Sequence, residues 1–171
     1  TPVGNFYIRS HAPVPKIDSQ SFRLIVDGLV ERPLSLSLAQ LNDEFDQHST
    51  VATLTCAGNR RSEHSLIKPV KGVPWQEGAI GNARWGGVLL SDVLKKAGIT
   101  ADAKHVWFEG LDEVPHGDGI IPFGGSIPLE KVFADTAGMP GALLTTKMND
   151  APLTGDHGAP LRTVVPGYIG A

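Results

Sequence analysis

The sequence predicts a mixed α+β domain, with mixed sheets, short helices and long loops. Apolar and polar residues alternate in short runs, which is typical of half-buried strands. The helical stretches are short, and strands and helices do not alternate with the regularity of βαβ units. With 171 residues, the chain is long enough for one sizeable core and short for two full domains. We therefore expect a single domain over residues 1–171.

Composition excludes several classes of partner and site. A net charge of -3 and a pI near 6.0 give no electrostatic reason to expect nucleic acid or an anionic membrane. The single cysteine excludes an internal disulfide and a cysteine-rich zinc or iron-sulfur site. No apolar run approaches the length of a membrane span, and the glycine fingerprints of dinucleotide and phosphate loops are missing. Any anion must be bound by locally placed arginines.

Most of the predicted elements are scaffold. Ser37 is a favourable N-cap, Gly98 a favourable helix stop, and Ser126 with Pro128 marks the start of another helix. We expect strands over 21–30, 34–38, 105–110, 143–148 and 161–165, and short helices over 38–45, 91–98 and 126–133.

Two stretches rich in Gly and Pro, 68–87 and 113–125, are predicted to be loops. The first carries Trp75 and Trp85, which on residue type alone are loop anchors packed onto the core. The second carries His116, to which we assign no role.

A further strand, over 51–55, ends at Cys56, and 57–59 has the composition of a turn. Arg60 and Arg61 follow at once. A permanent positive charge beside a thiol favours the thiolate, which is the form that attacks electrophiles or binds metals. The alternative is a buried structural cysteine.

The stretch from Cys56 to Glu63, Cys-Ala-Gly-Asn-Arg-Arg-Ser-Glu, resembles the molybdenum-binding signature of the eukaryotic-type sulfite oxidase family. That family includes bacterial sulfite dehydrogenases and assimilatory nitrate reductases. Further stretches agree with it in order and spacing, over essentially the whole chain: 6–15, 83–93, 108–112, 125–128, 156–162 and 165–167.

The resemblance implies a molybdopterin-binding domain of the sulfite oxidase type, whose loops wrap the cofactor. It implies that Cys56 binds molybdenum, that Arg9 and Arg61 neutralise an oxyanion substrate, and that Trp75 walls the pocket, whereas Trp85 is packing. The cofactor contacts that it implies are Tyr7, Ile8, Arg9, Ser10, His11, Asp112, His157 and Arg162.

Without the resemblance, these residues have ordinary interpretations. Arg9 would be a solvated charge, His11 a loop histidine, Asp112 a turn aspartate, and Asp156 with His157 a local pair. A cysteine hydrolase that uses Cys56, His157 and Asp156 would need only a nucleophile, a base and an orienting group. A third hypothesis is a module of the same fold that has no cofactor and no catalytic role.

The activity implied is oxidation of sulfite to sulfate on a molybdenum-molybdopterin cofactor. Nitrate reductase is the alternative, and Ser62 favours sulfite because nitrate reductases more often carry lysine there. The electron acceptor would be a cytochrome c or a haem domain or subunit, the full-length protein is a candidate homodimer, and the bacterial periplasm is slightly favoured as compartment.

The chain departs from the family's pattern in two ways. Relatives continue beyond the position of Ala171 with a basic segment and an immunoglobulin-like dimerisation domain, so we expect the end of the domain and the dimerisation domain to be missing here. Ser10 stands where many relatives carry asparagine.

Overall fold

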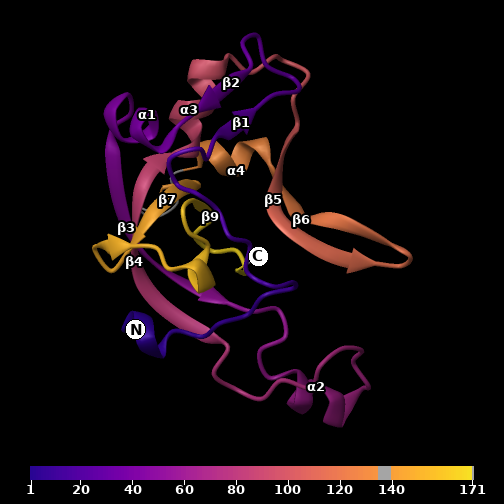
Figure 1. Cartoon of the computed structure of the whole chain (residues 1–171). Helices are drawn as coiled ribbons and strands as arrows, with labels where there is room; N and C mark the ends of the chain where they lie inside the picture. Colours follow the sequence, from indigo (N-terminus) through magenta and orange to yellow (C-terminus); the bar gives the residue numbers. More distant parts are fainter. Residues whose placement is uncertain (135–139, 171) are drawn as a thin grey trace.

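A five-stranded antiparallel sheet forms the centre of the molecule in the computed structural model, which describes residues 1–134 and 140–170. Strand β3 pairs with β4, β4 with β7, and β7 with both β8 and β9 (Figure 1). Short helices accompany the sheet, so the predicted α+β class is confirmed. The strands are β3 (Gln47–Thr55), β4 (Ile80–Leu89), β7 (Leu143–Met148), β8 (Ala151–Pro152) and β9 (Arg162–Val164).

Two further pairs of strands flank this sheet. Strands β1 (Leu24–Val26) and β2 (Leu34–Leu36) form a short antiparallel pair. Strands β5 (His105–His116) and β6 (Gly119–Pro128) form a long hairpin that extends away from the central sheet (Figure 1).

The helices gather at the two ends of the central sheet. Helices α1, α3 and α4 lie at one end and α2 lies beyond the other (Figure 1). None of the helices in the described part of the chain is long and apolar enough to span a membrane. The helices are α1 (Leu38–Asp43), α2 (Arg61–Ile67), α3 (Leu90–Ala97) and α4 (Leu129–Phe133), and the 3-10 turns are η1 (Val3–Asn5) and η2 (Gly155–His157).

The core has two clusters of buried side chains. One, which includes Leu41, lies under α1, α3 and α4. The other contains Phe6, Leu54 and Trp85. The Trp85 side chain is fully buried and its indole N–H donates to the carbonyl of Ala52 over 3.1 Å, so its predicted packing role is confirmed.

The prediction of a loop over 68–87 is wrong for its second half, because β4 begins at Ile80 and is a central strand. The glycines that suggested a loop permit close packing instead. A Cβ on Gly81 would lie 2.4 Å from the ring of Phe6, and one on Gly87 would lie 2.0 Å from the carbonyl oxygen of Leu144. Within this stretch, only residues 68–79 form an irregular segment, which contains isolated turns and no helix or strand.

The prediction of a loop over 113–125 is also wrong, since these residues belong to the β5–β6 hairpin. Gly117, with φ of +57°, forms its turn. Ser126 lies within β6, and α4 begins only after Pro128, so Ser126 does not cap a helix.

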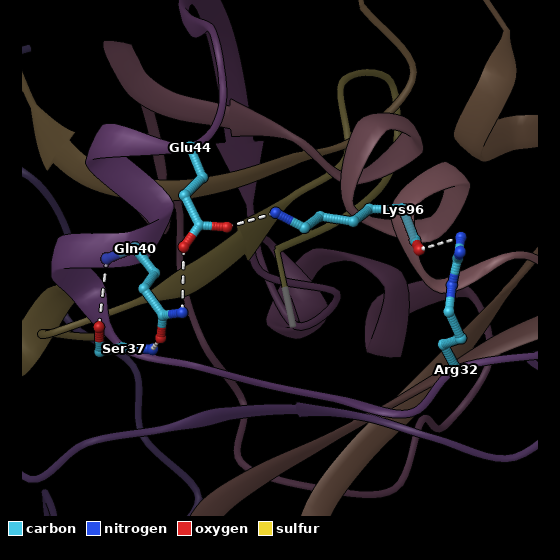
Figure 2. A network of polar contacts seen from close by, with 5 residues as sticks. All are labelled: Arg32, Ser37, Gln40, Glu44 and Lys96. Atoms are coloured by element: carbon cyan, nitrogen blue, oxygen red, sulfur yellow. Dashed lines mark hydrogen bonds and ion pairs between the residues drawn. The ribbon is translucent and has the colours of Figure 1, made fainter.

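A polar network joins α1 to α3 at the end of the sheet opposite to α2 (Figure 2). Ser37 and Gln40 form the capping box at the start of α1, each side chain accepting from the other residue's backbone N–H at 3.1 Å. Gln40 donates to Glu44 over 3.0 Å, Glu44 forms an ion pair with Lys96, and Arg32 donates to the Lys96 carbonyl. The Ser37 cap predicted from the sequence is therefore confirmed.

Candidate functional site

Cys56 lies in the turn that directly follows β3. Its backbone N–H donates to the Ala79 carbonyl and its carbonyl accepts from the Asn59 N–H, both over 2.9 Å. The N–H of Gly58 points at the sulfur, with 3.3 Å between nitrogen and Sγ. The half-buried thiol therefore has a backbone donor where a thiolate would carry its charge.

The two arginines after this turn have different environments. Arg60 has a left-handed backbone (φ 62°) and its guanidinium forms a two-pronged ion pair with Glu63, with Nε–Oε1 2.8 Å and Nη2–Oε2 2.5 Å. Arg61 instead donates from Nη1 to the Val73 carbonyl over 2.9 Å. Its guanidinium covers Gly58, where a Cβ would lie 2.9 Å from Nη2. Of the pair, Arg61 is the one that folds back over the cysteine turn.

Trp75 adjoins the same glycine. A Cβ on Gly58 would lie 2.8 Å from Trp75 Cδ1, so the absence of a side chain there lets Trp75 and Arg61 approach the turn together. The guanidinium carbon of Arg9 lies 5.9 Å from the centroid of the Trp75 ring, within cation–π range. The indole is 38% exposed, unlike the fully buried Trp85. The three residues predicted to handle substrate thus gather beside Cys56.

A second cluster lies around His157 and Arg162. The buried His157 has its Nδ1 2.7 Å from the hydroxyl of Thr154, and Arg162 donates from Nη1 to the His157 carbonyl over 3.1 Å. The Arg162 guanidinium also lies 5.2 Å from the Trp85 ring centroid. Burial lowers the pKa of both His157 and Arg162, and the positive charge of Arg162 lowers the pKa of His157 further.

Two polar atoms of this cluster are buried without a hydrogen-bond partner among the described residues, namely His157 Nε2 and Arg162 Nε. Leaving such groups unsatisfied costs free energy. Arg162 Nε therefore provides a donor for a bound group, and His157 Nε2 provides a donor or an acceptor according to its tautomer.

Tyr7 lies between the two clusters. Its ring stacks on Phe6 with 5.2 Å between centroids, and its hydroxyl oxygen lies 2.9 Å from where a Cβ on Gly170 would be. Burial raises the pKa of Tyr7, the charge of Arg162 lowers it, and Cys56 raises it again. Its phenol is thus close enough to respond to groups from both clusters.

A third contact links the N-terminal segment to the β5–β6 hairpin. The ring of His11 stacks on Phe123 of β6, with 4.6 Å between centroids and 18° between planes. Burial and the charge of Arg9 lower the pKa of His11, while the carboxylate of Asp112 raises it. Asp112 lies in β5 where the pairing with β6 shifts register between Glu109 and Glu113.

The N-terminal segment, residues 6–11, therefore contacts all three groups. Phe6 meets His157 edge-to-face with 5.6 Å between centroids, Arg9 meets Trp75, and His11 meets Phe123. Of the remaining predicted contacts in this segment, Ile8 is 57% exposed and Ser10 is exposed, with the Ser10 carbonyl accepting from Arg9.

Sequence reasoning missed several residues that build the site. Gly58 and Asn59 belong to the recognised turn, but their roles depend on which segment packs against it. Phe123 was placed in a loop, and Thr154 received no role. The local signal that could have identified Thr154 as the partner of His157 is its position three residues earlier in the sequence.

Within residues 1–134 and 140–170, no three His, Cys, Asp or Glu side chains come together as a metal-ligand group. Cys56 offers a soft sulfur ligand, which suits a redox metal. The unpartnered Arg162 Nε–H and the imidazole Nε2 of His157 fit an anionic, hydrogen-bonding group beside it. The residues present are thus consistent with an organic, metal-bearing cofactor.

Comparison with known proteins agrees with this description. The profile of the family described as oxidoreductase molybdopterin binding domain matches residues 11–171. A sulfite oxidase from Gallus gallus is 49% identical over 174 residues, covering 100% of this chain and 37% of that protein. A nitrate reductase [NADPH] from Emericella nidulans is 40% identical over 173 residues, covering 99% of this chain and 19% of that protein.

A solved structure, that of the sulfane dehydrogenase SoxCD from Paracoccus pantotrophus, has the same fold, with a TM-score of 0.75 and 30% identity. The match covers 95% of this chain and 38% of that one. The chain thus spans little more than a third of the sulfite oxidase and of the solved structure that it resembles.

Proposed function

Since the chain belongs to the oxidoreductase molybdopterin-binding domain family, we propose that it binds molybdenum-molybdopterin and supports the oxidation of sulfite to sulfate. One observation carries the proposal, the convergence of Arg9 and Arg61 on Trp75 beside Cys56. The higher identity to a sulfite oxidase than to a nitrate reductase, 49% against 40%, supports the choice of substrate. We also propose that residues 1–171 form one domain.

In this proposal, Cys56 supplies a thiolate to the metal, and the Gly58 N–H directed at its sulfur stabilises the charge. When bound, the cofactor accepts two electrons and mediates transfer of the oxygen atom. Tyr7, His157 and Arg162 hold it on the β9 side through a phenol, an imidazole and a guanidinium. The other contacts are Ile8, Ser10, His11 and Asp112.

Sulfite would be recognised by charge. Arg9 and Arg61 each carry a permanent positive charge, and together they match a dianion, whereas Trp75 limits access of water to one side. Arg61 keeps part of its guanidinium free for substrate, because only Nη1 is engaged by the Val73 carbonyl in the hydrogen bonds of the described residues.

The net reaction adds one oxygen from water to sulfite and releases two protons and two electrons. The electrons require an acceptor, which we propose is a cytochrome c or a haem domain or subunit. A homodimer of the full-length protein is part of the same proposal.

A paired assay tests the function. The full-length protein loaded with molybdenum cofactor is given sulfite and a one-electron dye, and separately nitrate and reduced viologen. We expect sulfite turnover to dominate, and Cys56→Ser to abolish it and change the sulfur coordination of molybdenum in X-ray absorption without unfolding the domain. Full activity of Cys56→Ser would refute the metal assignment, and dominant nitrate turnover would refute the substrate.

Nitrate reduction is the second candidate because a nitrate reductase matches 99% of the chain. Ser62 argues against it, since its short side chain adds no cation beside Arg61. Purified protein with neither molybdenum nor pterin, even when supplied with both, would instead favour a non-catalytic module.

A further inference from the structure

The pairing of β3 with β4 continues beyond the strands through an asparagine side chain. The last paired residues are Thr55 and Ile80. The next position along this ladder is Cys56 opposite Ala79, and the Cys56 N–H donates to the Ala79 carbonyl over 2.9 Å. In a regular antiparallel pair, the Ala79 N–H would return a bond to the Cys56 carbonyl.

That return bond is replaced. The Cys56 carbonyl accepts from the Asn59 N–H over 2.9 Å, because the chain has turned. The Ala79 N–H donates instead to Asn59 Oδ1 over 3.1 Å. The Asn59 amide oxygen therefore takes the place of the cysteine's carbonyl in the ladder, and the residue both closes the turn and joins it to the opposite chain.

The chain opposite this turn is the segment 73–79, which carries Trp75. It is bound to the turn further along by the Arg60 N–H to the Gln76 carbonyl and the Ser62 N–H to the Trp75 carbonyl, each over 3.0 Å. Both of these are bonds between backbone groups. Asn59 adds a side-chain contact between the turn and the segment 73–79, at the end next to β3 and β4. It lies three residues after Cys56 in the sequence.

We infer that Asn59 is a positioning residue, which sets the distance between Cys56 and the segment that carries Trp75. Its backbone N–H binds the carbonyl of Cys56, the proposed metal ligand. Its side chain binds the N–H of Ala79, which belongs to the segment that carries Trp75, the proposed wall of the substrate pocket. The inference rests on the proposed function only in treating this distance as the one between metal ligand and substrate pocket. The contacts themselves do not depend on a cofactor.

The test compares Asn59→Ala with Asn59→Asp in the chain without cofactor. Alanine removes the acceptor, whereas aspartate keeps an oxygen at the same reach. Hydrogen exchange of the Ala79 amide reports on the bond directly. Alkylation of Cys56, the single cysteine of the sequence, reports on the turn. With alanine, we expect both rates to rise roughly two- to tenfold, the range that corresponds to one lost hydrogen bond.

Asn59→Asp should return the Ala79 exchange rate to within about twofold of the unsubstituted chain. The control is Asn149→Ala in another part of the sheet, which removes a bond of the same kind, from the Arg84 N–H to Asn149 Oδ1 at 3.0 Å. It also removes the bond from Asn149 Nδ2 to the Thr1 carbonyl at 2.8 Å and places alanine at a φ of 51°, so it is the more disruptive change. It should leave Ala79 exchange and Cys56 alkylation unchanged.

Unchanged rates in Asn59→Ala, or equal increases in Asn149→Ala, would overturn the inference. So would exchange in Asn59→Asp that stays as fast as in Asn59→Ala. None of these outcomes depends on sulfite turnover, so the positioning role and the proposed function can fail separately.

Discussion

Arg61 makes a structural contact and carries the charge assigned to substrate. Arg61→Gln loses the charge, and its shorter side chain also gives up the bond from Nη1 to the Val73 carbonyl. We expect the Michaelis constant for sulfite to rise about ten- to a hundredfold, as for a lost charge-assisted bond of roughly 1.5 to 3 kcal/mol, with cofactor content unchanged. Steady-state kinetics and pterin analysis measure both.

Arg60→Gln is the matched control, because the Arg60 charge is already paired with Glu63. It should alter the Michaelis constant far less. Loss of pterin in Arg61→Gln without a change in that constant would assign Arg61 to the cofactor instead.

His157 makes the stability of the cofactor-free chain depend on pH. Its pKa is lowered in the folded chain by burial and by Arg162, against the weaker opposing effect of Asp156. A histidine whose folded pKa is depressed takes up its proton more readily in the unfolded chain. The free energy of unfolding should therefore fall as pH drops below about 6.5, the ordinary histidine pKa, and continue to fall until the folded pKa is passed.

Urea unfolding between pH 7.5 and pH 5 measures this slope. In His157→Gln the slope should be shallower, whereas His105→Gln, at an exposed position, should keep that of the unsubstituted chain. Equal slopes in all three proteins would show that His157 does not cause the effect.

At the scale of elements, local signals predict α1 and α3, place the start of α4 too early, and miss α2 and the glycine-rich strand β4. The capping box of Ser37 and the left-handed Gly98 at the end of α3 are local chemistry, readable from a few residues. The sequence predicts a loop for most of β4 because the packing partners that explain its glycines, Phe6 and Leu144, lie far away in the sequence. For the β5–β6 hairpin, the sequence predicts a strand only over 105–110, because the glycines and prolines of 113–125 are also typical of loops.

The candidate site shows the same division. Resemblance supplies Cys56 and Arg61 through the motif over 56–63, and it supplies Trp75 from outside the matching stretches. The contacts that place them depend on tertiary structure, and no local pattern encodes them. An example is Gly58, which lies against the side chains of both Arg61 and Trp75.

The α1 capping box gives a prediction at this scale. Ser37→Ala removes the side-chain acceptor for the Gln40 N–H and should lower the free energy of unfolding by about 1 kcal/mol. Chemical denaturation monitored by circular dichroism measures the loss. Ser35→Ala, at the exposed position of β2, should change stability by less than about 0.5 kcal/mol. An equal loss in both variants would mean that the cap adds nothing specific.

At the scale of the whole molecule, the N-terminal segment connects the separate parts of the candidate site. Through Phe6, Arg9 and His11, residues 6–11 contact three groups from different parts of the fold, around His157, around Trp75 beside the cysteine turn, and around Phe123. We therefore expect a bound cofactor to order this segment against the rest of the protein.

Trypsin provides the measurement. Cleavage after Arg9 and Lys16 should be fast in the chain without cofactor and slowed at least about tenfold when molybdenum cofactor is bound, because local opening must precede cleavage. Cleavage after Arg23, which precedes β1, is the internal reference and should not change. Equal protection at all three sites would indicate general stabilisation of the fold rather than ordering of this segment.

The way in which this segment is attached has a consequence for assembly. Within the described part of the chain, residues 7–17 make no backbone-to-backbone hydrogen bond, so stacked rings and an arginine hold them in place. A segment that is held only by side-chain contacts can detach while every strand of the sheet stays paired. A large, preformed cofactor could then enter a folded protein from the side and be enclosed afterwards. The domain would not have to fold around its cofactor.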